Sequence, residues 1–214
     1  MHVALLPVKS LTSAKGRLSV TISAAEREAL TRAMLADMVE ALAAARCLDR
    51  TYVLSADAEV LRAAGELGAE PLVEEAPSGD LNRAVATAAA KLGATGVTRL
   101  LTIPGDVPLI ESDDVETAFR IDAGSWPVVL IPSGSGSGTN GLLLSPPTVI
   151  VPCFEGASLA AHQNVCRERG LAVRVLELAS FALDVDTPED LAELSLRGRH
   201  RRSGRIVAAK RTAA

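Results

Sequence analysis

Short runs of valine, isoleucine and leucine alternate along this 214-residue chain with alanine-rich stretches of helical periodicity. This alternation is typical of a parallel or mostly parallel sheet with helices on both faces, because successive parallel strands need a crossover between them. The expected strands are residues 3–8, 51–55, 70–73, 99–103, 127–131, 141–144, 172–176 and 181–185. The sequence therefore predicts an α/β fold.

Helix start and stop signals agree with this alternation. Ser23 and Glu26 have the spacing of a capping box, which predicts a long helix through about Ala45. Further helices are expected after Asp57, Asp80 and Ser112, and over residues 158–169 and 188–196. Glycines stand where a left-handed residue would end three of these helices, at Gly68, Gly93 and Gly170.

The length and composition favour one domain. With 48% hydrophobic residues, the chain can bury one sizeable core, which we place in residues 1–196 as a single domain. Residues 197–214 are strongly basic, although the net charge is −4, and we expect them to form a disordered tail. Aromatic residues make up only 2%, so stacking platforms for nucleic-acid bases are nearly absent and no nucleic-acid partner is expected.

The cysteines and the first residues of the chain indicate in which cellular compartment the protein is expected. Cys47, Cys153 and Cys166 are odd in number and lack paired spacing, which favours neither a disulfide framework nor a zinc site. This usage fits a reducing cytoplasm. The first residues lack the features of a signal peptide, and no later run reaches membrane-spanning length. We expect a soluble cytoplasmic protein without a membrane partner.

Acidic residues follow two of the expected strands. Asp184 and Asp186 stand two apart, so a strand would place them on one face, and Asp106 follows another strand within P-G-D-V-P. The carboxyl ends of strands in such sheets bind ligands, and clustered carboxylates repel one another until a cation joins them. These three acids therefore predict a Mg²⁺ site. The alternatives are a turn that uses Asp106 to bond backbone N–H groups and a helix start at Thr187.

Three cations follow the first expected strand, at Lys9, Lys15 and Arg17. They offer charge-assisted hydrogen bonds to a polyphosphate, and Arg17 has the fork geometry for two phosphate oxygens. The P-loop pattern G-x-x-x-x-G-K-[ST] is absent, and a basic surface loop is the alternative. Asp80 and Asn82 open a later helix, where Asp80 fits an N-cap and both offer polar groups to a nucleobase edge.

A glycine- and serine-rich segment, residues 133–141, leads into a buried strand and contains Thr139. It fits either a flexible linker or a loop whose backbone N–H groups approach an anion. Downstream, Glu155 and Ser158 come just before or at a helix start, which attracts anions, although Ser158 also fits a simple N-cap. His162 is interpreted as structural because no nucleophile is paired with it by the sequence.

The motifs occur in an order that resembles a known family. P-V-K followed by A-K-x-R-L, then P-G-D-V-P, G-S-G-T-N-G-L-L-L, F-x-G-x-S and D-V-D-T-P-E-D-L together resemble the 2-phospho-L-lactate guanylyltransferase family of deazaflavin coenzyme biosynthesis. The similarity spans residues 3–194. It implies a Rossmann-like nucleotide-diphospho-sugar transferase fold. It also implies transfer of GMP from GTP to phosphoenolpyruvate, 3-phosphoglycerate or 2-phospholactate, with release of pyrophosphate and handover of the product to a downstream transferase.

The resemblance also assigns roles to residues. It implies Asp106, Asp184 and Asp186 as Mg²⁺ ligands, and Thr139 and Ser158 as acceptor-binding positions. Glu155 replaces a glycine that relatives carry next to the phenylalanine, which suggests a changed acceptor pocket. In the implied mechanism an acceptor phosphate oxygen attacks the α-phosphorus, while the cations of the first loop, Lys9, Lys15 and Arg17, neutralise the leaving pyrophosphate.

Two alternatives remain open at this stage. A molybdopterin- or sugar-phosphate-type nucleotidyltransferase would also use a first loop and a metal carboxylate, but its first loop is usually rich in paired glycines, where this chain has P-V-K. A non-catalytic nucleotide-binding protein would not need acids and bases at several strand ends. The sequence is compatible with a homodimer and does not select an oligomeric state.

Overall fold

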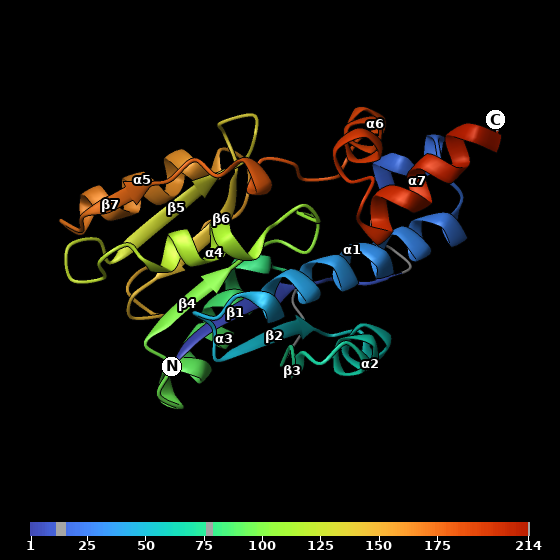
Figure 1. The fold of residues 1–214 in the computed structure, drawn as a ribbon. Coiled ribbons are helices and arrows are strands. Elements are labelled where there is room, and N and C mark those ends of the chain that lie inside the picture. The colour runs from blue at the N-terminus through green and yellow to red at the C-terminus, as the bar shows by residue number, and fades with distance from the viewer. Residues whose placement is uncertain (12–15, 76–78, 214) are drawn as a thin grey trace.

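The computed structural model describes residues 1–11, 16–75 and 79–213 (Figure 1). Within them, one sheet holds seven strands in the order β3-β2-β1-β4-β6-β5-β7. The strands are β1 His2–Pro7, β2 Arg50–Ser55, β3 Glu70–Val73, β4 Arg99–Thr102, β5 Val128–Pro132, β6 Thr139–Leu144 and β7 Val173–Val175. All neighbouring strands run parallel except β6, which is antiparallel to both β4 and β5.

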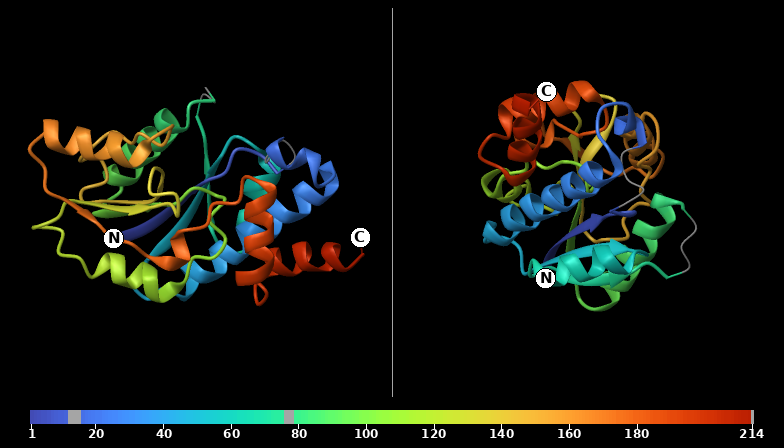
Figure 2. Two further views of the ribbon diagram at one scale, coloured as in Figure 1. Left: turned by 90° about the horizontal axis from the view of Figure 1, so that it is seen from above. Right: turned by 90° about the vertical axis from the view of Figure 1, so that its right-hand side faces the viewer.

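Helices cover both faces of the sheet, as the alternation predicts. They are α1 Ala24–Ala44, α2 Ala58–Glu66, α3 Leu81–Ala94, α4 Ser112–Phe119, α5 Ser158–Glu168, α6 Pro188–Arg197 and α7 Arg202–Ala213, with 3-10 turns at η1 Gly16–Val20 and η2 Ala179–Phe181. Helices α1, α2 and α4 share one apolar cluster with the sheet. Helices α3 and α5 pack on the opposite face, as the left view of Figure 2 shows. The mixed α/β fold is therefore confirmed.

The eighth predicted strand, residues 181–185, is wrong. Its first residue closes η2, and the rest runs to α6 without ladder partners among the described residues. Leu183 and Val185 are buried while Asp184 and Asp186 are partly exposed, so the alternation that suggested a strand is real. Alternation reports which side chains face a core, and it does not show that another strand lies alongside.

Local capping signals are largely confirmed. The Ser23 hydroxyl accepts the Glu26 N–H at 3.3 Å and Glu26 accepts the Ser23 N–H at 2.6 Å, which completes the capping box. Gly68 and Gly170 adopt positive φ just past their helices. The prediction for Gly93 is wrong, because α3 continues through Ala94 and Gly96 takes the left-handed conformation, with φ of 90°.

The basic end of the chain is helical where a disordered tail was predicted. Helix α7 lies beside α1 and α6 (Figure 1), and its start is held by Asp37 of α1, a residue that is 1% exposed. The Asp37 carboxylate accepts the N–H groups of Arg202 and Ser203, both at 2.9 Å, and the Ser203 hydroxyl at 2.6 Å. The composition of the tail suggested disorder. It could not reveal the docking, because the docking depends on a carboxylate 165 positions earlier.

None of the described helices is both long and apolar enough to cross a membrane.

Replacing Asp37 with alanine should release α7 from α1. Three hydrogen bonds to a buried charged group are lost, so we expect the free energy of unfolding to fall by about 3 kcal/mol. Urea titration would measure the loss. The control is Glu40→Ala, one turn along α1, because Glu40 pairs with Arg202 only at the exposed surface and should change stability little. Equal losses in the two variants would contradict the special role of Asp37.

Candidate active site

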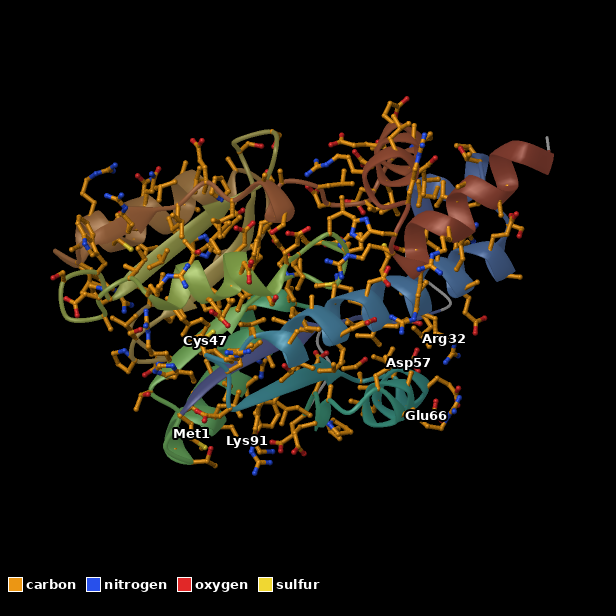
Figure 3. The ribbon with its side chains drawn as sticks, in the orientation of Figure 1. Met1, Arg32, Cys47, Asp57, Glu66 and Lys91 are labelled. Atoms are coloured by element: carbon orange, nitrogen blue, oxygen red, sulfur yellow. The ribbon has the colours of Figure 1, made fainter. Side chains whose placement is uncertain are left out.

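Two adjoining cavities open at the carboxyl ends of the central strands. The first has a volume of about 190 Å³ and the second about 280 Å³. They share a wall made of Pro7, Val8, Lys9 and Leu81. Figure 3 marks Asp57, just past the carboxyl end of β2, and Met1 at the opposite end of the sheet. The cavities therefore lie where an open α/β sheet binds ligands.

The first cavity is mainly apolar and carries two carboxylates. Apolar side chains of Leu54, Leu81 and Ala84 line it together with the carboxylate-bearing residues Glu74 and Asp80. Apolar walls with a few polar groups are typical of small-molecule sites, and a planar base fits such walls. Sequence analysis selected Asp80 and missed Glu74, which follows β3 within an acidic stretch that carried no distinguishing motif.

Two of the predicted metal ligands, Asp106 and Asp186, line the second cavity beside Lys9. They are brought together by a backbone hydrogen bond of 2.9 Å from the Val185 N–H to the Asp106 carbonyl. Asp184 lies next to them. Burial raises the pKa of the Asp184 carboxyl, and the nearby negative charges of Asp106 and Asp186 raise it further, against a hydrogen bond from Asn140. The three predicted acids are therefore close enough to interact.

The described residues contain no group of three or more His, Cys, Asp or Glu side chains gathered around one metal position. The acids fit a cation that takes only a few carboxylates and completes its shell with phosphate oxygens and water. Mg²⁺ has this preference. Burial is the main cause of the raised pKa of Asp184, and the charges of Asp106 and Asp186 add to it, which fits a cation at this place.

Strand β6 contains a β-bulge where it pairs with β5. Thr139 pairs with Pro132 and Gly141 with Ile131, so Asn140 is the extra residue. The Asn140 amide donates to the Phe181 carbonyl at 2.8 Å and to Asp184 Oδ1 at 3.3 Å. Sequence analysis quoted Asn140 in a motif without giving it a role. A Cβ at the neighbouring Gly141 would lie 2.7 Å from Ile131 Cδ1, so a larger residue there would force the Ile131 side chain to shift.

Thr139 and Ser158, the two predicted acceptor positions, lie together as expected. The Thr139 N–H donates to the Ser158 hydroxyl at 2.8 Å, and the two residues are only 3% and 2% exposed. Ser158 is the first residue of α5, and Ala157 rather than Ser158 occupies the N-cap position. Glu155 is exposed on the same loop. The Ser158 hydroxyl therefore ties the start of α5 to β6, and Glu155 lies exposed on the loop before α5.

The glycine- and serine-rich segment is an ordered turn rather than a flexible linker. The hydroxyls of Ser133, Ser135 and Ser137 form a chain with 2.9 Å between successive oxygens. The Gly134 N–H donates to the Ala182 carbonyl at 2.7 Å, which ties this turn to the segment that carries Asp184. The turn therefore helps to position one of the acids.

Of the residues predicted to contact the phosphates and the base, some line the cavities, one holds a loop, and others lie outside the described residues. Lys9 lines both cavities, whereas Lys15 and the side chain of Arg17 lie outside the described residues. Asp80 caps α3 by accepting the Arg83 N–H at 3.1 Å and also lines the first cavity. Asn82 accepts the Phe154 N–H at 2.6 Å, so its carbonyl oxygen holds the loop at residues 153–158.

Asp57, which the sequence marked only as the residue before a helix, caps α2 and has a further role. Burial favours its neutral form, but hydrogen bonds from the Ser10 side chain and from the backbone of Glu59, Val60 and Leu11 hold the pKa of Asp57 below its ordinary value. A charged Asp57 therefore anchors residues that directly follow Lys9. The signal that could have revealed this role is its place at the end of β2, next to the first loop.

His162 is fully buried and bonded on both ring nitrogens. Nε2 accepts the Cys153 N–H at 2.9 Å, so the ring proton is on Nδ1 and is donated to the Thr139 hydroxyl at 3.1 Å. Burial lowers the pKa of His162 to about 4, against a hydrogen bond that the ring donates to the Ser158 backbone carbonyl. The imidazole is therefore neutral at physiological pH, in agreement with the structural interpretation.

Comparison with known proteins identifies the family. The family model described as "Guanylyl transferase CofC like" matches residues 2–209. The chain belongs to the CofC-like guanylyl transferases. Among similar members, the phosphoenolpyruvate guanylyltransferase of Conexibacter woesei is 42% identical over 89% of this chain and 86% of its own. The 2-phospho-L-lactate guanylyltransferase of Methanothermobacter thermautotrophicus is also 42% identical, over 91% of this chain and 84% of its own.

Solved structures agree on the fold of this CofC-like chain. A protein of Desulfovibrio desulfuricans G20, provisionally named a nucleotide-diphospho-sugar transferase, superposes with a TM-score of 0.82. It shares 19% identity and covers 99% of this chain and 96% of its own. A nucleotidyl transferase of Methanothermobacter thermautotrophicus superposes with a TM-score of 0.70 at 13% identity, over 94% of this chain and 99% of its own. The CofC-like chain is a nucleotidyltransferase with this fold.

The buried His162 predicts a specific pH dependence of stability. Its pKa is about 4 in the folded chain and near its ordinary 6.5 when unfolded, so only the unfolded chain binds a proton between these values. Stability should therefore be highest above pH 6.5 and fall as the pH drops toward 4, by roughly 3 kcal/mol in total. Denaturant midpoints across this range would measure it. A His162→Gln variant should lose this component, and an unchanged slope would contradict the assignment.

Proposed function

We propose that this protein transfers GMP from GTP to a small phosphorylated acid, with release of pyrophosphate, in deazaflavin coenzyme biosynthesis. The observation that carries the proposal is the cluster of Asp106, Asp184 and Asp186 beside Lys9, next to a cavity with apolar walls. Clustered acids suit a cation on a triphosphate, and the adjoining cavity suits its nucleoside.

The names of relatives suggest three candidate acceptors. Proteins of this family with phosphoenolpyruvate, 2-phospho-L-lactate and 3-phospho-D-glycerate in their names all match most of the chain. Because the first two are equally similar to this chain, overall identity does not choose between them. We favour phosphoenolpyruvate or 3-phosphoglycerate over 2-phospho-L-lactate, because Glu155 stands at the surface of the proposed acceptor loop and alters its charge.

The residues divide into two sides. We assign Lys9, Lys15 and Arg17 to the triphosphate, and Asp80 and Asn82 to the nucleoside side, where Asp80 lines the first cavity. The acceptor side is assigned to the loop at residues 153–158 with the neighbouring β6. On this side we assign Thr139, Glu155 and Ser158 to acceptor binding.

The mechanism needs no protein nucleophile. An acceptor phosphate oxygen, already anionic at neutral pH, forms a bond to the α-phosphorus as the bond to the bridging oxygen of pyrophosphate breaks. Asp106, Asp184 and Asp186 would hold Mg²⁺, which supplies charge neutralisation when bound. Lys9 orients the triphosphate and offsets the charge that develops on the leaving group. Positioning and electrostatic stabilisation therefore account for the rate.

A substrate panel tests the reaction. We expect pyrophosphate release with GTP, Mg²⁺ and at least one of phosphoenolpyruvate, 3-phosphoglycerate and 2-phospholactate, because the site combines a triphosphate-binding side with an acceptor loop. The product should be captured by coupling to the next transferase. Turnover with CTP or UTP and a sugar phosphate, but none with GTP, would instead favour a sugar-phosphate nucleotidyltransferase. A lack of turnover with every pair would favour a non-catalytic nucleotide-binding protein.

Neutralising any one of the three acids should slow turnover without unfolding the protein. For Asp106→Asn, Asp184→Asn and Asp186→Asn, we expect kcat to fall on the order of a hundredfold or more, as for loss of one preorganised charge contact. The free energy of unfolding without metal should stay level or rise because repulsion is relieved. Glu168→Gln, at the far end of α5, is the matched control. A large stability loss in the aspartate variants would mean that these acids are structural.

A further inference from the structure

We propose that His162 is a positioning residue for the acceptor, because it holds the loop at residues 153–158 against β6. Through this loop, His162 is linked to α3 on the nucleotide side of the site. The inference rests on the proposed function in one respect, which is the assignment of this loop to the acceptor. The hydrogen bonds themselves are independent of it.

The imidazole joins two segments that are distant in sequence. From α5, its Nε2 accepts the N–H of Cys153 in the loop, and its Nδ1 donates to Thr139 at the start of β6. His162 is 0% exposed, so both contacts are made without competition from water. One side chain therefore sets the spacing between the loop and the strand whose bulge holds Asn140 against Asp184.

The next amide of the loop is held from the opposite side. The Phe154 N–H donates to Asn82 Oδ1 at 2.6 Å, and the Phe154 ring meets the His162 ring edge-on with 5.4 Å between centroids. Asn82 is the second residue of α3 and directly follows Leu81, which lines both cavities. Two consecutive amides, at Cys153 and Phe154, are thus fixed by α5 and α3. The following residues, Glu155 and Gly156, are exposed and face solvent.

A purely structural histidine would act differently from a positioning one. A structural role predicts lower stability with no preference between the two substrates. A positioning role predicts a raised KM for the acceptor, because the loop loses its anchor while the phosphate-binding side keeps its own contacts. The imidazole suits this position because it is neutral and offers one donor and one acceptor, which match the Thr139 hydroxyl and the Cys153 N–H.

Three variants separate these roles in steady-state assays with the acceptor that the wild-type chain uses. His162→Leu removes both ring hydrogen bonds and should raise the acceptor KM by about tenfold, with a much smaller change in the KM for GTP. His162→Gln should restore most of the acceptor KM because a side-chain amide also carries one donor and one acceptor. The control is Cys166→Ala, one turn further along α5 and equally buried in an apolar cluster, which should leave both KM values unchanged.

Hydrogen exchange provides a readout that does not depend on catalysis. The amides of Cys153 and Phe154 should exchange faster in His162→Leu than in the wild type, and the amide of Cys153 should be protected again in His162→Gln. Cys166→Ala should leave both amides protected. If His162→Leu does not fold, His162→Asn replaces it, because its shorter polar side chain cannot reach both Thr139 and Cys153. A raised acceptor KM with faster exchange at Cys153 would support the anchor, and wild-type values of both would overturn it.

The outcomes that overturn the proposal differ from those that overturn the function. Equal rises in the KM values for GTP and the acceptor, or unchanged exchange at Cys153 in His162→Leu, would reduce His162 to a core residue. A wild-type chain that releases no pyrophosphate with any phosphorylated three-carbon acid would instead overturn the proposed function. The acceptor role of His162 would fall with it, even if exchange at Cys153 showed that the contact exists.

Discussion

The hydrogen bond from the Val185 N–H to the Asp106 carbonyl is the contact on which the site depends, because it joins two segments that carry the acids. Leu183 and Val185 are buried on either side of Asp184, and this apolar burial holds the segment in place although no strand pairs with it among the described residues. The fold thereby stabilises a group of like charges that would separate in a free chain.

The antiparallel strand β6 organises the other half of the site. Its bulge sends Asn140 toward Asp184 and Thr139 toward His162, so one strand contacts both the acid cluster and the acceptor loop. The close approach of Ile131 explains why glycine occupies position 141. A bulge placed beside a ligand site commonly re-aims side chains in this way.

Helix α7 shows how a basic composition misled the prediction of disorder. Its start would leave unpaired N–H groups, and Asp37 of α1 satisfies two of them from within a buried position. Nothing in the local sequence of residues 197–214 reveals this partner, because the partner lies far away along the chain. The same reasoning applies to Asp57, whose local role as a helix cap conceals its hydrogen bonds to the first loop.

The sequence by itself determined the α/β class, seven of the eight predicted strands to within two residues of their observed bounds, and the capping box at Ser23, because periodicity and caps are local properties. It also predicted that Asp106, Asp184 and Asp186 lie close together, although the strand on which the placement of Asp184 and Asp186 rested does not form. Tertiary structure alone decided that residues 181–185 lack a strand partner, that α7 docks, and that His162 bridges Thr139 and Cys153. Pairing and docking depend on residues brought together from distant positions, which no local pattern encodes.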